Sequence, residues 1–251
     1  MKRRMAHCRI GLLLVLIAPV LMALIRRLAR TGGSDVAPSG ETARVQRYYD
    51  EVASRYDRSM KLAERFLVGD GRRWVCSQAN GDVLEIAIGT GRTLPYYPED
   101  VRLTGIDLSR EMLAVARGRA TELGREVDLE VGDAEALAFP DQRFDTVVIT
   151  LALCSIPDER RALAETMRVL RQGGRLLLLE HVASDQWPVR AIQRLLNPLS
   201  VRFAADHLLR EPGRAAEAAG FQIEHVERAK WGIIERMSAQ AQGQLIPPAT
   251  V

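Results

Sequence analysis

Residues 83–98 read VLEIAIGTGRTLPYYP and join an apolar run to a glycine-rich turn. The apolar part predicts a buried strand, and Gly89-Thr90-Gly91 predicts a tight turn after it. One carboxylate, Glu85, interrupts the apolar run. Glycines at the carboxyl end of a strand let the backbone approach a ligand closely. This stretch therefore predicts an α/β fold with a binding site at the turn.

Segments typical of strands and helices alternate through the rest of the domain. Apolar runs predict strands at 82–88, 102–106, 127–131, 144–150 and 175–180. Helices are expected at 110–123 and 158–170, since an N-cap residue opens the first and glycines follow both. Two alternating runs near the end, FQIEHVERA and WGIIERMSA, predict an antiparallel hairpin at the sheet edge. The pattern indicates a mostly parallel sheet with helices on both faces.

A nicotinamide-dependent oxidoreductase is one alternative for a glycine turn at this position. A dinucleotide site needs G-x-G-x-x-G, so that the pyrophosphate can sit on the helix N-terminus. Here Leu94 stands where the third glycine is required, and Pro95 follows it. The dinucleotide alternative is therefore disfavoured.

Charge is distributed unevenly along the 251 residues, which carry a net charge of +3. Residues 1–34 hold basic residues and no acidic one, so the remainder of the chain is slightly acidic. An acidic domain lacks the electrostatic footprint of a nucleic-acid-binding protein. The three cysteines show no paired spacing, which argues against a disulfide framework or a zinc site and favours a reducing compartment.

The N-terminal segment contains an uncharged run, IGLLLVLIAPVLMALI at 10–25, flanked by arginines. A cleaved signal peptide and a buried helix are alternatives, but LIRRLAR follows where a cleavage site would be expected. We expect residues 1–30 to form a hydrophobic membrane anchor, 31–40 a flexible linker and 41–251 the folded domain. Arginines on both flanks leave the orientation of the anchor open.

Several ordered motifs resemble the class I S-adenosylmethionine-dependent methyltransferases. They are Glu85-x-Ala87-x-Gly89-x-Gly91, TGIDLS at 104–109, VGDAEALAFPDQRFD at 131–145 and VLRQGGRLLLLEHV at 169–182. The entry segment YYDEVASRYD at 48–57 is most similar to quinone and phospholipid methyltransferases and to membrane-anchored thiol methyltransferases. The resemblance implies a Rossmann-like seven-stranded sheet of order 3-2-1-4-5-7-6, with the last strand antiparallel.

The resemblance also implies S-adenosylmethionine as the cofactor and gives roles to individual residues. Asp107 would hold the ribose hydroxyls, Asp133 would lie near the adenine amine, and Glu85 would support the turn and face the methionine end. Alanine at position 87, where the family has glycine, fits if its φ is negative. The expected cofactor-binding residues are Tyr56, Glu85, Ala87, Gly89, Gly91, Asp107, Leu108, Asp133, Ala134 and Thr150.

Methyl transfer from a sulfonium depends mainly on proximity and alignment, so a catalytic side chain need not be conspicuous. The candidate general base is His181, directly after the fifth strand; a purely structural histidine is the alternative. No metal is expected. The segment 184–211 mixes apolar residues with arginines, which is typical either of an ordinary helical insertion or of a lipophilic acceptor pocket at a membrane surface.

The sequence thus predicts a membrane-associated methyltransferase whose catalytic domain is cytoplasmic and whose acceptor is a phospholipid amine, a quinone or a thiol. A cofactor-binding protein without catalysis is the remaining alternative. The identity of the acceptor and the oligomeric state are left open.

If 10–25 is an anchor, deletion of residues 1–34 removes the apolar run that partitions into lipid. We expect the truncated protein to move from the membrane fraction to the supernatant when cells are lysed and fractionated. A truncated protein that stays with the membranes would argue against the anchor.

Overall fold

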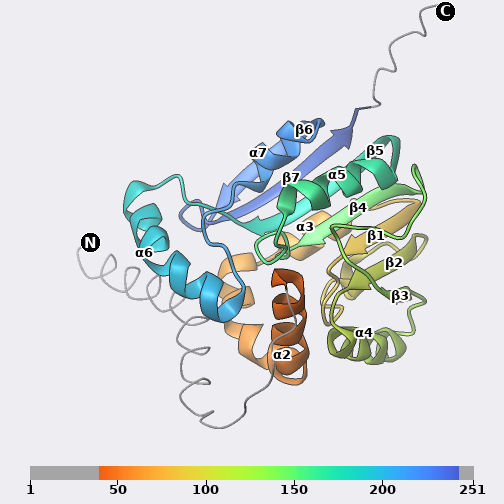
Figure 1. The fold of residues 1–251 in the computed structure, drawn as a ribbon. Coiled ribbons are helices and arrows are strands. Elements are labelled where there is room, and N and C mark those ends of the chain that lie inside the picture. Colours follow the sequence, from red (N-terminus) through yellow and green to blue (C-terminus); the bar gives the residue numbers. More distant parts are fainter. Residues whose placement is uncertain (1–39, 243–251) are drawn as a thin grey trace, which may run out of the picture.

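A computed structural model describes residues 40–242, which form a seven-stranded sheet between layers of helices (Figure 1). The strands are β1 (Asp82–Ile86), β2 (Arg102–Asp107), β3 (Asp128–Val131), β4 (Phe144–Thr150), β5 (Leu170–His181), β6 (Phe221–Ala229) and β7 (Ile234–Ala241). The helices are α2 (Glu41–Ala63), the π-helical turn η1 (Glu64–Val68), α3 (Gly71–Cys76), the 3-10 turn η2 (Leu94–Tyr96), α4 (Arg110–Leu123), α5 (Glu159–Val169), α6 (Trp187–Ala204) and α7 (Pro212–Ala218).

The strand order is β3-β2-β1-β4-β5-β7-β6, which confirms the predicted topology. The first five strands pair in parallel, and β7 runs antiparallel to both β5 and β6. Parallel strands end at one edge of a sheet. The loops after β1, β2 and β4 are therefore brought together, although they are far apart in the sequence.

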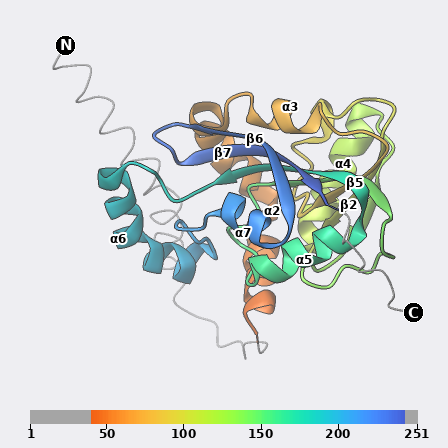
Figure 2. The ribbon, with the colours of Figure 1, turned by 90° about the horizontal axis from the view of Figure 1, so that it is seen from above.

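Each face of the sheet has its own core, because successive side chains of a strand point to opposite faces. On β5, Leu176 and Leu178 belong to one core, and the alternate residues Leu177 and Leu179 belong to the other. In Figure 2, α5 and α7 cover one face, and α3 and α4 cover the other. The continuous leucine run of this strand is thus explained by burial on both sides.

Local capping residues begin the helices where the sequence predicts them. The Ser109 hydroxyl accepts a hydrogen bond from the Met112 amide at 3.0 Å and caps α4, while Gly124 ends that helix in a left-handed conformation. The Asp158 carboxylate caps α5 in the same way. An N-cap of this kind contributes about 1 kcal/mol to stability.

The backbone of Ala87 does not meet the condition under which an alanine fits at this place. Ala87 has a φ of 55°, whereas an unstrained fit needs a negative φ. The left-handed turn ends β1 at Ile86, two residues earlier than the apolar run predicts. A side chain in this region costs about 1–2 kcal/mol, so strain is held at the end of the strand that leads to the glycine turn.

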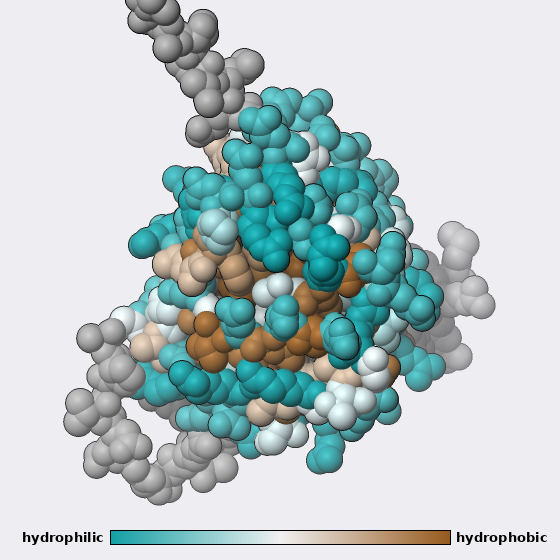
Figure 3. Space-filling view, turned by 90° about the vertical axis from the view of Figure 1, so that its right-hand side faces the viewer, coloured by the Kyte–Doolittle hydropathy of each residue, from teal (hydrophilic) through white to brown (hydrophobic). Residues whose placement is uncertain are grey.

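No helix within residues 40–242 is both long enough and apolar enough to cross a membrane. The expected anchor and most of the expected linker lie outside these residues. Figure 3 shows a face of the domain on which apolar residues gather in the middle of a hydrophilic rim. Apolar side chains are therefore accessible at this surface.

Replacing Ala87 with glycine relieves the left-handed strain, so we expect the free energy of unfolding to rise by about 1 kcal/mol. Equilibrium urea unfolding measures the change. The matched control is Ala162→Gly, in the buried interior of α5, which should lower stability by about 1 kcal/mol or more. A loss of stability in both variants would contradict a strained Ala87.

Candidate active site

A cleft with about 810 Å³ of open space lies at the carboxyl ends of β1, β2 and β4. It adjoins the loops that the sheet topology brings together, and α2 supplies part of its wall. Eight of the ten predicted cofactor residues line it: Tyr56, Ala87, Gly89, Asp107, Leu108, Asp133, Ala134 and Thr150. The fold therefore brings most of the predicted cofactor-binding residues together around this cleft.

Asp107 ends β2 and is held by two backbone donors. The amide of Gly89 donates to one carboxylate oxygen at 2.9 Å, and the amide of Ser109 donates to the other at 2.8 Å. Burial raises the pKa of Asp107 to about 6, against the effect of these donors. Each oxygen keeps a further lone pair, so the ionised group can accept the two hydroxyls of a ribose.

The two glycines of the turn serve different purposes. A Cβ built on Gly89 would meet no atom within 4 Å, so it would project into the open cleft. A Cβ on Gly91 would lie 2.8 Å from Leu94 and 3.3 Å from Ala116, and this glycine does not line the cleft. Gly89 thus leaves room for a ligand, whereas Gly91 allows the turn to pack against the domain.

Glu85 lies fully buried beneath the turn and does not line the cleft. One carboxylate oxygen accepts hydrogen bonds from Thr93 at 2.7 Å and Tyr97 at 2.9 Å. Burial raises the pKa of Glu85 to about 7, although both donors favour the ionised form. The carboxylate in the apolar strand therefore anchors the segment after the turn, and its role toward the methionine end stays a prediction.

Ion pairs fix α2 and η1 over the glycine turn. Asp57 accepts a hydrogen bond from the Thr90 hydroxyl at 2.7 Å and also pairs with Arg119 of α4. Glu64, at the start of η1, pairs with Arg92. These side chains are only partly exposed, so solvent screens the pairs less than it would at an open surface. These contacts thus hold α2, which forms part of the cleft wall, against the glycine turn.

Arg72 is a buried cation of the cleft that no sequence motif marks. It donates to the Thr150 hydroxyl and to Glu64, both at 2.8 Å, while its Nε has no hydrogen-bond partner among the described residues. In sequence it stands in an ordinary short helix, GRRWVC. The position of Arg72 in the cleft follows only from the packing of α3 on the sheet.

A second cavity, with about 1030 Å³ of open space, adjoins the cleft. Four residues line both hollows: Tyr49, Tyr56, Leu151 and Ser155. The hydroxyls of Tyr49 and Ser155 are 2.7 Å apart, which joins α2 to the loop after β4 at this shared wall. The second cavity extends from there between η1 and α6, past mostly apolar side chains.

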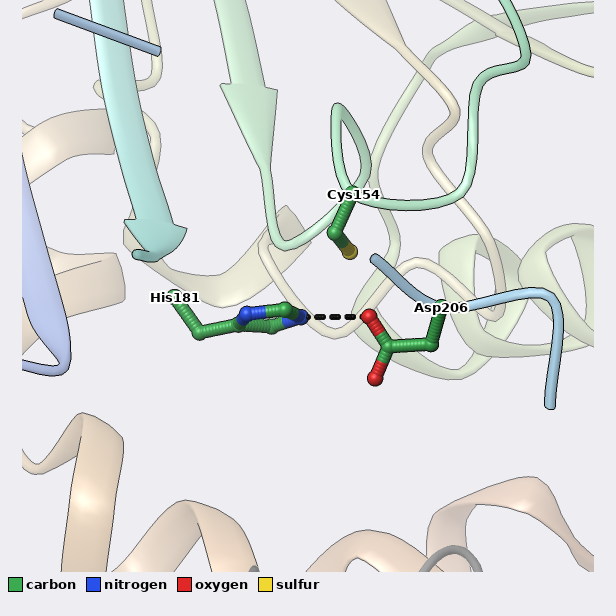
Figure 4. A group of neighbouring side chains, drawn as sticks. All are labelled: Cys154, His181 and Asp206. Carbon is green, nitrogen blue, oxygen red and sulfur yellow. Dashed lines mark ion pairs between the residues drawn. The ribbon is translucent and has the colours of Figure 1, made fainter. Parts of the chain in front are cut away.

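The structure places His181, the candidate base, in the second cavity rather than in the cleft. Its Nε2 lies 2.7 Å from Oδ1 of Asp206, and the thiol of Cys154 is close by (Figure 4). Asp206 follows α6 and was not selected from the sequence, where nothing distinguishes it from other loop carboxylates. Its place depends on how α6 folds back over the end of β5.

Residues 84–178 match the family model described as a methyltransferase domain. Over 118 residues the chain is 43% identical to a phosphatidylethanolamine N-methyltransferase of Cereibacter sphaeroides, which covers 46% of this chain and 58% of that protein. It is 34% identical to the ubiquinone/menaquinone C-methyltransferase UbiE of Roseobacter denitrificans, over 64% of this chain and 68% of that one. The chain thus spans about three fifths to two thirds of the length of these relatives.

The fold itself is shared with solved structures. A methyltransferase from Thermotoga maritima superimposes with a TM-score of 0.61 and 21% identity, over 79% of this chain and all of that one. The glycine turn, the carboxylate at the end of β2 and the space left by Gly89 fit the cofactor of this group. The chain belongs to the S-adenosylmethionine-dependent methyltransferases.

Proposed function

We propose that the protein transfers a methyl group from S-adenosylmethionine to a lipophilic acceptor. The observation that carries this proposal is the wall shared by the cofactor cleft and the second cavity. Two ligands that meet at a common wall can be held in line for a displacement, and such alignment can lower the barrier by about 7–11 kcal/mol.

In the cleft, we assign the ribose to Asp107 and the adenine to the side of Asp133 and Ala134. The methionine end then lies toward the turn and Thr150, close to the second cavity. The Asp133 carboxylate is fixed by the Glu135 amide, which donates to it at 2.9 Å. When the cofactor is bound, it supplies an electrophilic methyl group, and the residues of the cleft hold that group toward the shared wall.

The second cavity suits an apolar acceptor. Its wall includes Met60, Leu67, Leu208 and Ile233, and Cys154 and Asp206 lie close to His181 within it. The relatives are named for phosphatidylethanolamine and for ubiquinone and menaquinone synthesis, and these compounds are lipophilic. Both observations favour a lipophilic acceptor for this chain, with His181 next to the reacting atom.

A membrane surface is the source of acceptor that fits best. The large apolar side chains of Trp187 and Leu195 on α6 are 80% and 77% exposed, and Phe66 of η1 is 60% exposed. α6 carries arginines and no acidic residue, which suits an anionic lipid surface. Since η1 and α6 also line the second cavity, we place its mouth toward the lipid, with the catalytic domain in the cytoplasm.

Cofactor affinity should depend on the charge of Asp107. Its pKa of about 6 predicts constant affinity above pH 7 and a fall of about tenfold per pH unit below pH 6, because only the ionised form accepts both hydroxyls. Calorimetry across this range measures the effect.

Asp107→Asn should bind S-adenosylmethionine about 10²-fold more weakly, since the charged hydrogen bonds are lost, and its pH dependence should disappear. The control Asp128→Asn, at an exposed position of the neighbouring strand, should behave as the native chain does. Equal affinities in both variants would remove the ribose assignment.

The proposed reaction is tested with the full-length protein, methyl-labelled S-adenosylmethionine and a total lipid extract of the host. We expect label in the organic phase, with a product one methylene heavier than its acceptor by mass spectrometry. Ser200→Phe should fill the second cavity and reduce labelling at least about tenfold while cofactor affinity stays unchanged.

The matched control is Leu199→Phe, at the adjacent and half-exposed position of α6. This variant should transfer label to lipid to the same extent as the native protein. Cofactor binding without label in the organic phase would transfer support to a polar acceptor or to a protein that binds the cofactor without catalysis.

A further inference from the structure

Three side chains with ionisable groups meet in the second cavity from separate parts of the chain. Cys154 follows β4, His181 ends β5, and Asp206 follows α6 (Figure 4). Their functional atoms all lie within 4.8 Å of one another, and His181 and Asp206 form an ion pair at 2.7 Å. None of these three residues lines the cofactor cleft.

The His181–Asp206 pair is mostly buried, and both residues line the second cavity. The side chains of His181 and Asp206 are 22% and 19% exposed, and Cys154 is buried. Glu180 is also near, but one of its oxygens accepts the amides of Ala152 and Leu153 at 2.9 and 3.0 Å, so it holds the loop after β4. The titratable groups on the remaining walls are Tyr48, Tyr49, Tyr56 and Glu64.

Asp206 keeps the imidazole charged. Burial, the largest single effect, would lower the pKa of His181, but Asp206 and Cys154 together raise that pKa well above its usual value. Conversely, burial would raise the pKa of Asp206, and the His181 charge holds it below the usual value. Asp206 is an ion-pair partner of Nε2 by distance, although the two atoms do not have hydrogen-bond geometry, and Nδ1 is the other donor that the imidazolium can offer.

We propose that the His181–Asp206 pair selects acceptors whose reactive atom is an anion, a thiolate or a phenolate on an apolar tail. This inference rests on the proposed function and assigns the acceptor class of the same site. His181 contacts the reactive atom, and Asp206 is a positioning residue that orients the ring and preserves its charge.

The chemistry balances without a further reactant. The thiol or phenol loses its proton to solvent and binds as the anion beside the imidazolium. A lone pair of that anion forms the new bond to the methyl carbon, while the bond from this carbon to the sulfonium breaks. The electron pair of the broken bond stays on the sulfur of the cofactor, which leaves as S-adenosylhomocysteine.

An amine acceptor fits the pair poorly. At neutral pH an alkylamine is an ammonium ion, which must lose a proton before it can attack. An imidazolium cannot take that proton, and its charge opposes the ammonium ion. The apolar walls would admit the tail of such a molecule, so the His181–Asp206 pair is what makes the distinction.

The test compares 1-octanethiol, 4-octylphenol and octylamine with the full-length protein and methyl-labelled S-adenosylmethionine. The octyl tails are matched, so kcat/KM reports on the reactive atom. We expect methylation of the thiol or the phenol, and the ratio between them identifies which of the two sources is used. Octylamine should react at least about 10²-fold more slowly.

Asp206→Asn should lower kcat/KM for the preferred acceptor about 10²-fold with unchanged cofactor affinity. It should also move the high-pH limb of the kcat/KM profile to lower pH, because the imidazolium then loses its proton more readily. A structural defect alone would not move that limb. Asp185→Asn, at an exposed loop position outside the cavity, is the control and should leave activity and profile unchanged.

The possible outcomes separate the two proposals. Turnover of octylamine as fast as that of the thiol and the phenol would overturn the anionic acceptor. An unchanged high-pH limb of the kcat/KM profile in Asp206→Asn would do the same. Either result would leave the methyltransferase proposal in place. No product from any of the three compounds would contradict both. Binding of cobalt(II) with a thiolate charge-transfer band that Cys154→Ser removes would assign the three residues to a metal site and overturn the proposal.

Discussion

The carboxylate of Asp107 is the constraint on which the cofactor cleft depends. It accepts the Gly89 amide of one loop and the Ser109 amide of another, and so it joins the ends of β1 and β2. The Ser109 hydroxyl in turn donates to Asp50 of α2 at 2.6 Å. One charged group therefore aligns the glycine turn, the start of α4 and the covering helix. Because its oxygens are already oriented by backbone donors, little reorganisation is left for a ligand to induce.

The second requirement is that α2 stays over the turn, and here electrostatics and packing act together. Asp57, Glu64 and their arginine partners are only partly exposed, so solvent does not fully screen these ion pairs. The three tyrosines of α2 pack edge to face beside them, with ring centroids 5.2 and 6.3 Å apart. Glu64 lines the second cavity while its partner Arg92 lines the cleft. This ion pair thus connects the walls of the two hollows.

The parts of the site that depend on local sequence were predictable, and the parts that depend on tertiary packing were not. The glycine turn and Asp107 are marked by residues close in sequence, because the strand, the turn and the strand-end carboxylate recur in a fixed order. The backbone of Ala87 did not follow from its residue type, since the domain imposes a left-handed conformation that alanine does not favour. Arg72 and Asp206 carry no local signal. Their functional positions exist only once α3 packs on the sheet and α6 returns over β5.

The difference in predictability between the cleft and the second cavity follows the chemistry of the cofactor and the acceptor that we propose for them. The proposed cofactor site lies where the sheet topology forces loops together, so its residues are fixed by the fold and marked by short sequence motifs. The second cavity is walled by α2, η1 and α6 and by the ends of β5 and β7, which are joined by long-range contacts. Substitutions there change the shape and charge offered to an acceptor without disturbing Asp107 or the turn. A fold built in this way can retain one methyl donor while its acceptor changes, so in the function that we propose the charges that face the second cavity, and not the glycine motif, select the molecule that is methylated.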